Sequence, residues 1–214
     1  LPILVSYTVI LCMGNGYTCD ESNILSIIDR QLFGEAHLYQ KSPIDPEGFV
    51  STLSAIAHTC IGFSCGKWII QSHQTENKVL RLFLTGFILM SIGYLLADAL
   101  PLNKRIWSPT FVLVTCGAAS MSLATLMYYI DIRNKQKWCR FFIIFGVNPL
   151  FLYVLSEVLA IMMGSTGWKA AAYAAIHSGI TDAYLASAVY ALVFTLFLGC
   201  IGYPLYLKKI YIKL

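Results

Sequence analysis

The sequence predicts an all-α fold, a polytopic transmembrane bundle of about six helices of which the first is truncated. Of the 214 residues, 57% are hydrophobic and only 12% are charged, whereas about a quarter are charged in soluble domains. A span needs roughly 20 mostly apolar residues, and several stretches reach that length. These stretches are residues 48–70, 79–100, 110–130, 141–163 and 184–207.

The first apolar stretch is shorter than a span. Residues 1–13 precede a Gly14-Asn15-Gly16 turn, and at 1.5 Å per residue they cover about 20 Å of the roughly 30 Å required. We therefore expect the chain to begin inside a helix and to be part of a larger bundle. The expected organisation is a truncated helix at 1–13, an outer-side loop with a short amphipathic helix at 14–47, and five further spans at 48–214.

The distribution of Lys and Arg predicts the orientation, because cytoplasmic connections carry the excess of basic residues. One side has ten: Lys67, Lys78, Arg81, Arg133, Lys135, Lys137, Arg140, Lys208, Lys209 and Lys213. The other has five: Arg30, Lys41, Lys104, Arg105 and Lys169. This bias predicts a cytoplasmic C-terminus and places the 14–47 loop outside. Trp68, Trp107, Trp138 and Trp168 lie near predicted helix ends, as an aromatic belt would.

Nucleic-acid and metal binding have little support in the sequence. The net charge of +4 follows from the topology rather than from one basic face. No Cys pair has the CxxC spacing of a zinc site, and the four histidines do not form a convincing ligand set. They are His37, His58, His73 and His177. Only Cys12 and Cys19 could meet in an oxidising compartment.

The loop at 14–47 contains a predicted short helix. Asp20 or Ser22 can cap it, and Gly34 can end it. Its apolar residues recur at helical spacing, which places Asp29 and Arg30 on the opposite face. Those apolar residues are Ile24, Ile27, Ile28 and Leu32.

The segment Asp45-Pro46-Glu47-Gly48 has two interpretations. Asp45 suits an N-cap, Pro46 suits the first turn of a helix, and Glu47 suits the positive end of the helix dipole. The segment is then only the start of the second span. The alternative is a substrate contact at the outer mouth.

Polar residues within two spans require an account, since ionisable groups in a bilayer are costly. In the second span Ser51, Ser54, His58, Gly62 and Cys65 share one face, which must look into the bundle. That face either packs closely or lines a cavity at His58. In the span at 141–163 we expect Glu157 to be buried, about 8 Å beyond the midpoint, with Tyr153 on the same face. Asn148 reaches the same cavity only if Pro149 bends the span.

Four blocks of sequence resemble a known family. They are IDRQLFGEAHLYQ at 28–40, DPEGFVSTLSAIAHTCIGFSCGKWI at 45–69, LNKRIWSPTFVLVTCG at 102–117 and GVNPLFLYVLSEVL at 146–159. In collinear order they resemble the heparan-alpha-glucosaminide N-acetyltransferase-like transmembrane acyltransferases, whose bacterial branch is often labelled as N-acetylglucosamine-related. The resemblance covers almost the whole chain after Asn23.

The resemblance implies transfer of an acetyl group from acetyl-CoA to an amino sugar across the membrane. The family's catalytic histidine precedes the matched region, so no residue here inherits that role, and we expect the missing N-terminal half to supply it. Asp45, Glu47, Arg30 and His37 are then expected to border the sugar-side opening of the pocket. Further implied partners are membrane lipid and the amino sugar or its glycan, with a homodimer left open; the expected location is a bacterial inner membrane.

Two other functions stay open at this point. The row of polar residues on one face of the second span, here called the polar stripe, would be consistent with an amino-sugar transporter, as would discontinuous helices. No internal repeat is visible, however, between the first and last three spans. A structural membrane subunit would use the buried polar residues only for packing.

Overall fold

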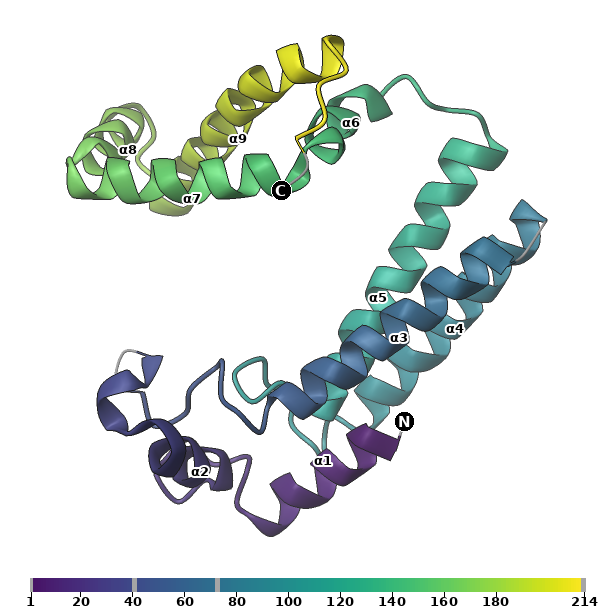
Figure 1. Cartoon of the computed structure of the whole chain (residues 1–214), viewed down its shortest axis with the longest axis vertical. Helices are drawn as coiled ribbons and strands as arrows, with labels where there is room; N and C mark the ends of the chain where they lie inside the picture. Colours follow the sequence, from purple (N-terminus) through teal and green to yellow (C-terminus); the bar gives the residue numbers. More distant parts are fainter. Residues whose placement is uncertain (1, 40–41, 72–73, 213–214) are drawn as a thin grey trace. The chain divides into compact units, whose positions relative to one another are not determined.

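The computed structural model describes residues 2–39, 42–71 and 74–212. All regular elements among them are helical (Figure 1), which confirms the predicted fold class. The chain divides into two compact units, Leu1–Asn134 and Lys135–Leu214, and each is described by itself.

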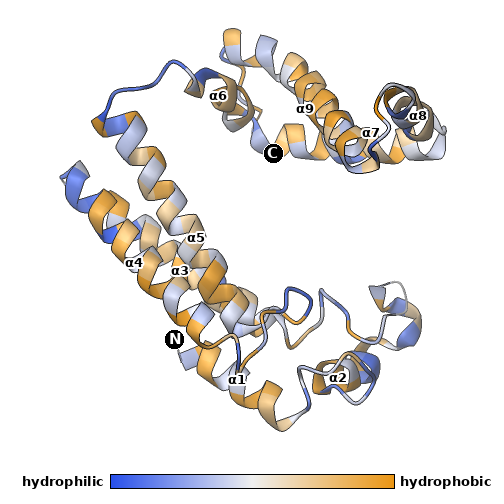
Figure 2. Cartoon of the chain, turned by 180° about the vertical axis from the view of Figure 1, so that it is seen from behind, coloured by the Kyte–Doolittle hydropathy of each residue, from blue (hydrophilic) through white to orange (hydrophobic). Residues whose placement is uncertain are grey.

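The first unit is built on three long helices that run side by side in Figures 1 and 2. They are α3 (Thr52–Gln71), α4 (Thr75–Leu95) and α5 (Pro109–Met127), which continues as a π-helical turn, η3 (Tyr128–Ile132). The shorter α1 (Pro2–Met13) packs on α3 and α5. A short pair, α2 (Ile24–Phe33) and η1 (Glu35–His37), lies in the connection from α1 to α3.

Length and apolar composition make four of the described helices candidate membrane spans: Thr52–Gln71, Thr75–Leu95, Pro109–Ile132 and Ala183–Leu207. Many of their large apolar side chains are exposed, and Figure 2 shows the apolar residues along these helices. Outward-facing apolar side chains are what a helix in lipid presents. The chain is therefore an integral membrane protein.

Two glycines allow the backbones of α4 and α5 to come into contact where the helices cross. A Cβ atom built on Gly86 would lie 2.7 Å from the carbonyl oxygen of Gly117, and one built on Gly117 would lie 2.6 Å from the carbonyl oxygen of Gly86. Small residues at a helix crossing permit this approach, on which association within a membrane depends. α5 is accordingly the most buried of the candidate spans.

The second unit contains α6 (Cys139–Val147), α7 (Pro149–Ser165), α8 (Trp168–Gly179) and α9 (Ala183–Leu207). The helix expected to run continuously through 141–163 is divided, because α6 and α7 meet at an angle of 81°; together the pair is long and apolar enough to form one broken span. Asn148 between them has φ −135° and ψ 60°, outside the helical region. Pro149 does not bend one continuous helix. It begins a new helix at the first position, where its missing N–H costs nothing.

The sequence-based interpretation of α2 needs two corrections. Its N-cap is Asn23, whose side-chain oxygen accepts a hydrogen bond from the Leu25 N–H at 2.9 Å, and neither Asp20 nor Ser22 takes that place. Asp29 is only 1% exposed, so it does not share a solvent face with Arg30. The helix does end at Gly34, which has φ 76°.

The DPEG segment is not the start of the second span. Helix α3 begins at Thr52, and the residues before it form turns in which the Gly48 N–H donates to the Asp45 carbonyl at 3.2 Å. Three residues that enter the orientation and metal arguments lie outside the described residues: Lys41, His73 and Lys213.

We predict that Gly117→Ala lowers the stability of the first unit by about 1–3 kcal/mol, the usual cost of overpacking. The added methyl group would meet backbone atoms of Gly86 and Met90, both at 2.6 Å, and backbone cannot rotate away. The measurement is the thermal unfolding midpoint in detergent. Gly66→Ala on α3 is the control, since its Cβ meets nothing within 4 Å; equal midpoints for the two variants would contradict the close crossing.

Candidate functional site

A cavity of about 430 Å³ lies at the end of the first unit from which α3 and α5 begin. We call it the loop-end cavity. Its lining comes from two connections that are far apart in the sequence, one before α3 and one before α5. The lining residues are Tyr39, Pro46, Glu47, Lys104, Arg105 and Trp107.

Asp45 positions two of these lining residues. Its carboxylate accepts a hydrogen bond from the Glu47 N–H at 2.9 Å and another from the Tyr39 N–H at 3.1 Å. This is an Asx-type turn, in which a side chain fixes the backbone two residues on. Asp45 is expected from the sequence to border the cavity, and in the structure it holds the wall rather than forming it.

The connection before α5 is organised by its own polar side chains. Ser108 caps α5 by accepting from the Phe111 N–H at 3.2 Å, and the same hydroxyl accepts from the Asn103 N–H at 3.0 Å. The Asn103 side chain in turn accepts from the Arg105 N–H at 2.8 Å. These contacts fix the backbone that carries Lys104 and Arg105, whose side chains are exposed.

Trp107 joins this connection to α3. Its carbonyl accepts a hydrogen bond from the buried Ser54 hydroxyl at 2.6 Å, and its indole N–H donates to Nδ1 of His58 at 3.4 Å. Trp107 has φ +52°, a conformation that is unusual for a bulky residue and persists only where its surroundings determine it. The two hydrogen bonds with α3 fix Trp107 in this conformation.

The predicted polar stripe on α3 does face α5 and its connection. Besides Ser54 and His58, Cys65 lies 3.6 Å from the Ser120 hydroxyl of α5. His58, Gly62 and Cys65 also line a groove of about 230 Å³ between the two helices. The stripe therefore both packs the helices and borders a groove that begins at His58.

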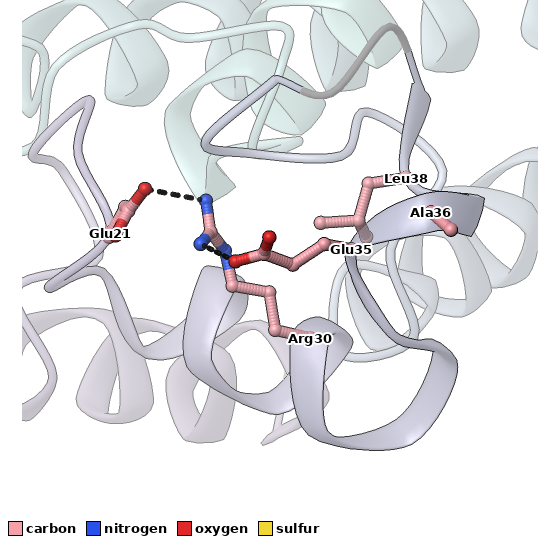
Figure 3. A pocket seen from close by; sticks show the side chains of 5 residues that line it. All are labelled: Glu21, Arg30, Glu35, Ala36 and Leu38. Atoms are coloured by element: carbon pink, nitrogen blue, oxygen red, sulfur yellow. Dashed lines mark hydrogen bonds and ion pairs between the residues drawn. The ribbon is translucent and has the colours of Figure 1, made fainter.

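Arg30 does not line the loop-end cavity. Its guanidinium pairs with Glu21 at 3.1 Å and with Glu35 at 2.7 Å, and these side chains border a separate cavity of about 400 Å³ (Figure 3). His37 is exposed, with Nδ1 2.8 Å from the Phe33 carbonyl oxygen, and it lines neither cavity. Of the four residues expected at the sugar-side opening, the structure brings Asp45 and Glu47 together.

The three residues expected in the second unit do not form one cavity. Asn148 is buried, and its amide donates to the Ile210 carbonyl at 2.8 Å and accepts from the Ile212 N–H at 2.8 Å. Tyr153 and Glu157 are exposed on α7, so the second unit itself does not bury Glu157 as expected, and its depth in a membrane stays a prediction. The break before Pro149 divides the helix along which that depth was calculated.

Sequence reasoning missed Lys104, Arg105, Trp107 and Tyr39. The signal for the two cations is present in LNKRIW, where they stand together on the side that has few basic residues. From the sequence, Lys104 and Arg105 contribute only to the charge count, and Trp107 only to the aromatic belt. Their joint place opposite Glu47 depends on the tertiary fold.

The loop-end cavity presents two cations, one carboxylate and two aromatic rings. Such a lining can hold a polar ligand that carries both an ammonium or hydroxyl group and an anionic group, with ring faces against its apolar surface. Within the described residues, no three His, Cys, Asp or Glu side chains come close enough together to hold a metal ion.

Two acetyltransferases are similar in sequence to this chain. No protein-family profile matches the chain. The chain is similar to heparan-alpha-glucosaminide N-acetyltransferase of Mus musculus, with 27% identity over 87% of this chain, and to that of Homo sapiens, with 28% identity over the same share. The match spans about 30% of the length of these relatives. It confirms the resemblance found in the four sequence blocks.

We predict that Ser54→Ala destabilises the first unit by about 1–3 kcal/mol, because it leaves the Trp107 carbonyl without its buried donor. Thermal unfolding in detergent measures this loss. Ser64→Ala on the same helix is the matched control, since its hydroxyl donates to the Cys60 carbonyl within its own helix at 2.8 Å. A loss no larger than that of the control would show that Ser54 does not hold the connection.

Proposed function

We propose that this chain forms part of an integral membrane acyltransferase that moves an acetyl group from acetyl-CoA to the amino group of a glucosamine-type sugar. The observation that carries the proposal is its collinear similarity to two heparan-alpha-glucosaminide N-acetyltransferases over 87% of the chain. The residues that line the loop-end cavity fit an amino sugar, which supports the same function.

The acceptor sugar lies in the loop-end cavity in this proposal. The Glu47 carboxylate attracts its ammonium or accepts hydrogen bonds from its hydroxyls. Trp107 and Tyr39 offer aromatic faces to the apolar side of the sugar ring. Lys104 and Arg105 then face any carboxylate or sulfate elsewhere on the acceptor.

The chemical step is attack of the neutral amine on the thioester carbonyl. A carbon–nitrogen bond forms and the carbon–sulfur bond breaks. A base takes the proton that the amine loses and passes it to the departing thiolate, so that coenzyme A leaves as the thiol. The amine and the carbonyl must be held about 3–3.5 Å apart. This chain orients the acceptor, and the base comes from the N-terminal half that we propose completes the protein.

The proposed topology follows the positive-inside rule. The 14–47 loop and the loop-end cavity face the outside of a bacterial inner membrane, and the C-terminus is cytoplasmic. Acetyl-CoA enters from the cytoplasmic side, and its thioester extends through the bundle to the acceptor. Membrane lipid surrounds the spans, and two copies of the complete protein can associate.

A transporter of amino sugars such as N-acetylglucosamine is the second candidate function. The break of 81° between α6 and α7 favours it, because transporters form their binding sites at discontinuous helices. A structural membrane subunit is the third.

One experiment separates these functions. The intact protein is reconstituted in liposomes and supplied with labelled acetyl-CoA and glucosamine, and sugar uptake is measured in parallel. Acetylated glucosamine formed without net uptake is the expected result. Uptake without acetylation would establish the transporter, and neither activity would leave only the structural subunit.

We predict that Glu47→Gln raises KM for the acceptor about tenfold or more and changes kcat less. Losing a charge-assisted hydrogen bond costs about 1.5–3 kcal/mol, and 1.4 kcal/mol is a factor of ten. Steady-state acetyl transfer measures both constants. Glu76→Gln, an exposed glutamate in the first turn of α4, is the control; equal KM values for the two variants would exclude Glu47 from the acceptor site.

A further inference from the structure

Asp29 of α2 is a buried carboxyl group outside the lining of the loop-end cavity. It is 1% exposed. One carboxyl oxygen, Oδ1, accepts a hydrogen bond from the Phe49 N–H at 2.8 Å. The other, Oδ2, is buried and has no hydrogen-bond partner among the residues that the structure describes.

Gly48 permits this contact between α2 and the turn before α3. A Cβ atom at Gly48 would lie 2.2 Å from Oδ2 of Asp29 and 3.0 Å from its Cγ, so any side chain there would displace the Asp29 carboxyl group or push the two segments apart. The carbonyl of the same glycine accepts from the Ser51 hydroxyl at 2.7 Å. The turn is thus seated directly on the Asp29 carboxyl group.

Two carboxyl groups therefore hold the backbone on either side of the cavity residue Glu47. Asp45 accepts from the N–H of Glu47 itself, and Asp29 accepts from the N–H of Phe49 two residues later. Without either of these hydrogen bonds, one end of the short segment that directs Glu47 into the loop-end cavity would be free to move.

The surroundings of Asp29 favour its neutral form. Burial raises the pKa of Asp29 above its usual 3.8, the nearby Asp45 carboxylate raises it further, and the hydrogen bond from Phe49 partly opposes both. The phenol of Tyr7 from α1 also lies near the group. The neighbouring Tyr17 hydroxyl stays neutral, since burial raises its pKa to about 12. The adjacent cation, Arg30, is paired with Glu21 and Glu35.

We propose that Asp29 is a positioning residue for Glu47, and that its protonation state controls whether the turn at 45–49 is seated for acceptor binding. The inference rests on the proposed function for its effect on acetyl transfer. Its structural part, a turn that loosens when Asp29 ionises, does not.

The direction of the pH effect follows from linkage. A carboxyl group with a raised pKa in the folded protein binds its proton more tightly there than in the loosened state, so the seated turn is stabilised at low pH. That contribution is lost as the pH rises above the usual Asp value and through the raised one. Ionisation of Asp45 would act in the opposite direction, because a carboxylate accepts the Glu47 N–H more strongly than a neutral carboxyl does.

The experiment is hydrogen exchange of the intact protein in nanodiscs between about pH 4 and about pH 8, a range that starts near the ordinary Asp pKa. Exchange is corrected for its intrinsic pH dependence and followed in peptides that contain residues 45–49. Wild-type protection should fall severalfold as the pH rises. Asp29→Asn, which keeps the acceptor oxygen and cannot ionise, should remove this dependence.

Asp20→Asn is the matched control, because Asp20 is an exposed carboxylate of the same loop whose hydrogen bonds with Ser22 lower its pKa. It should keep the wild-type pH dependence. Wild-type protection that does not fall with pH would overturn the proposal, even if Asp29→Asn fails to fold. So would an Asp29→Asn variant that folds and behaves like the control.

The activity measurement is made on the same three proteins. KM for the acceptor should rise with pH more steeply in the wild type and in Asp20→Asn than in Asp29→Asn, while kcat changes in parallel in all three. Parallel KM profiles would show that the turn does not govern acceptor binding. Absence of acetyl transfer in every protein would contradict the proposed function, whereas hydrogen exchange would still decide the behaviour of Asp29.

Discussion

The carbonyl groups of Ile106 and Trp107 accept hydrogen bonds from two different helices, and the loop-end cavity depends on that pair of contacts. Tyr7 of α1 donates to the first, and Ser54 of α3 donates to the second. Both donors are fully buried, where an unmatched polar group costs about 1–3 kcal/mol. The connection before α5 is therefore fixed on the helix ends, and Lys104, Arg105 and Trp107 hold their places opposite Glu47.

The long helices could be predicted from the sequence because apolar runs of span length have few alternative structures. Where the prediction failed, a local contact decided the outcome. Asn148 ends α6 by bonding to Ile210 and Ile212, about sixty residues away in sequence, and no pattern near Pro149 reveals that partner. Asp29 looked like a surface residue of an amphipathic helix, yet the turn at Gly48 covers it.

The candidate site was predictable only in part, because some of its residues are brought together by contacts between distant segments. Glu47 was singled out by its motif, and it lines the cavity. Arg30 was expected beside it, but Glu21 and Glu35 lie closer to its guanidinium. Lys104 and Arg105 line the same cavity as Glu47 only because α3 and α5 start at the same end of the unit, an arrangement set by the tertiary fold. Similarity to two heparan-alpha-glucosaminide N-acetyltransferases supports the proposed chemistry, which the cavity alone does not indicate.

A single acceptor site, formed jointly by the connections before α3 and α5, is central to the proposed function. Photocrosslinking of the intact protein with a glucosamine that carries a small photoreactive group tests it most directly. Peptide mapping should find the label in both segments that line the cavity, around Glu47 and around Lys104 to Trp107, and excess glucosamine should suppress it. Label confined to the second unit, or label that glucosamine does not suppress, would contradict the joint site.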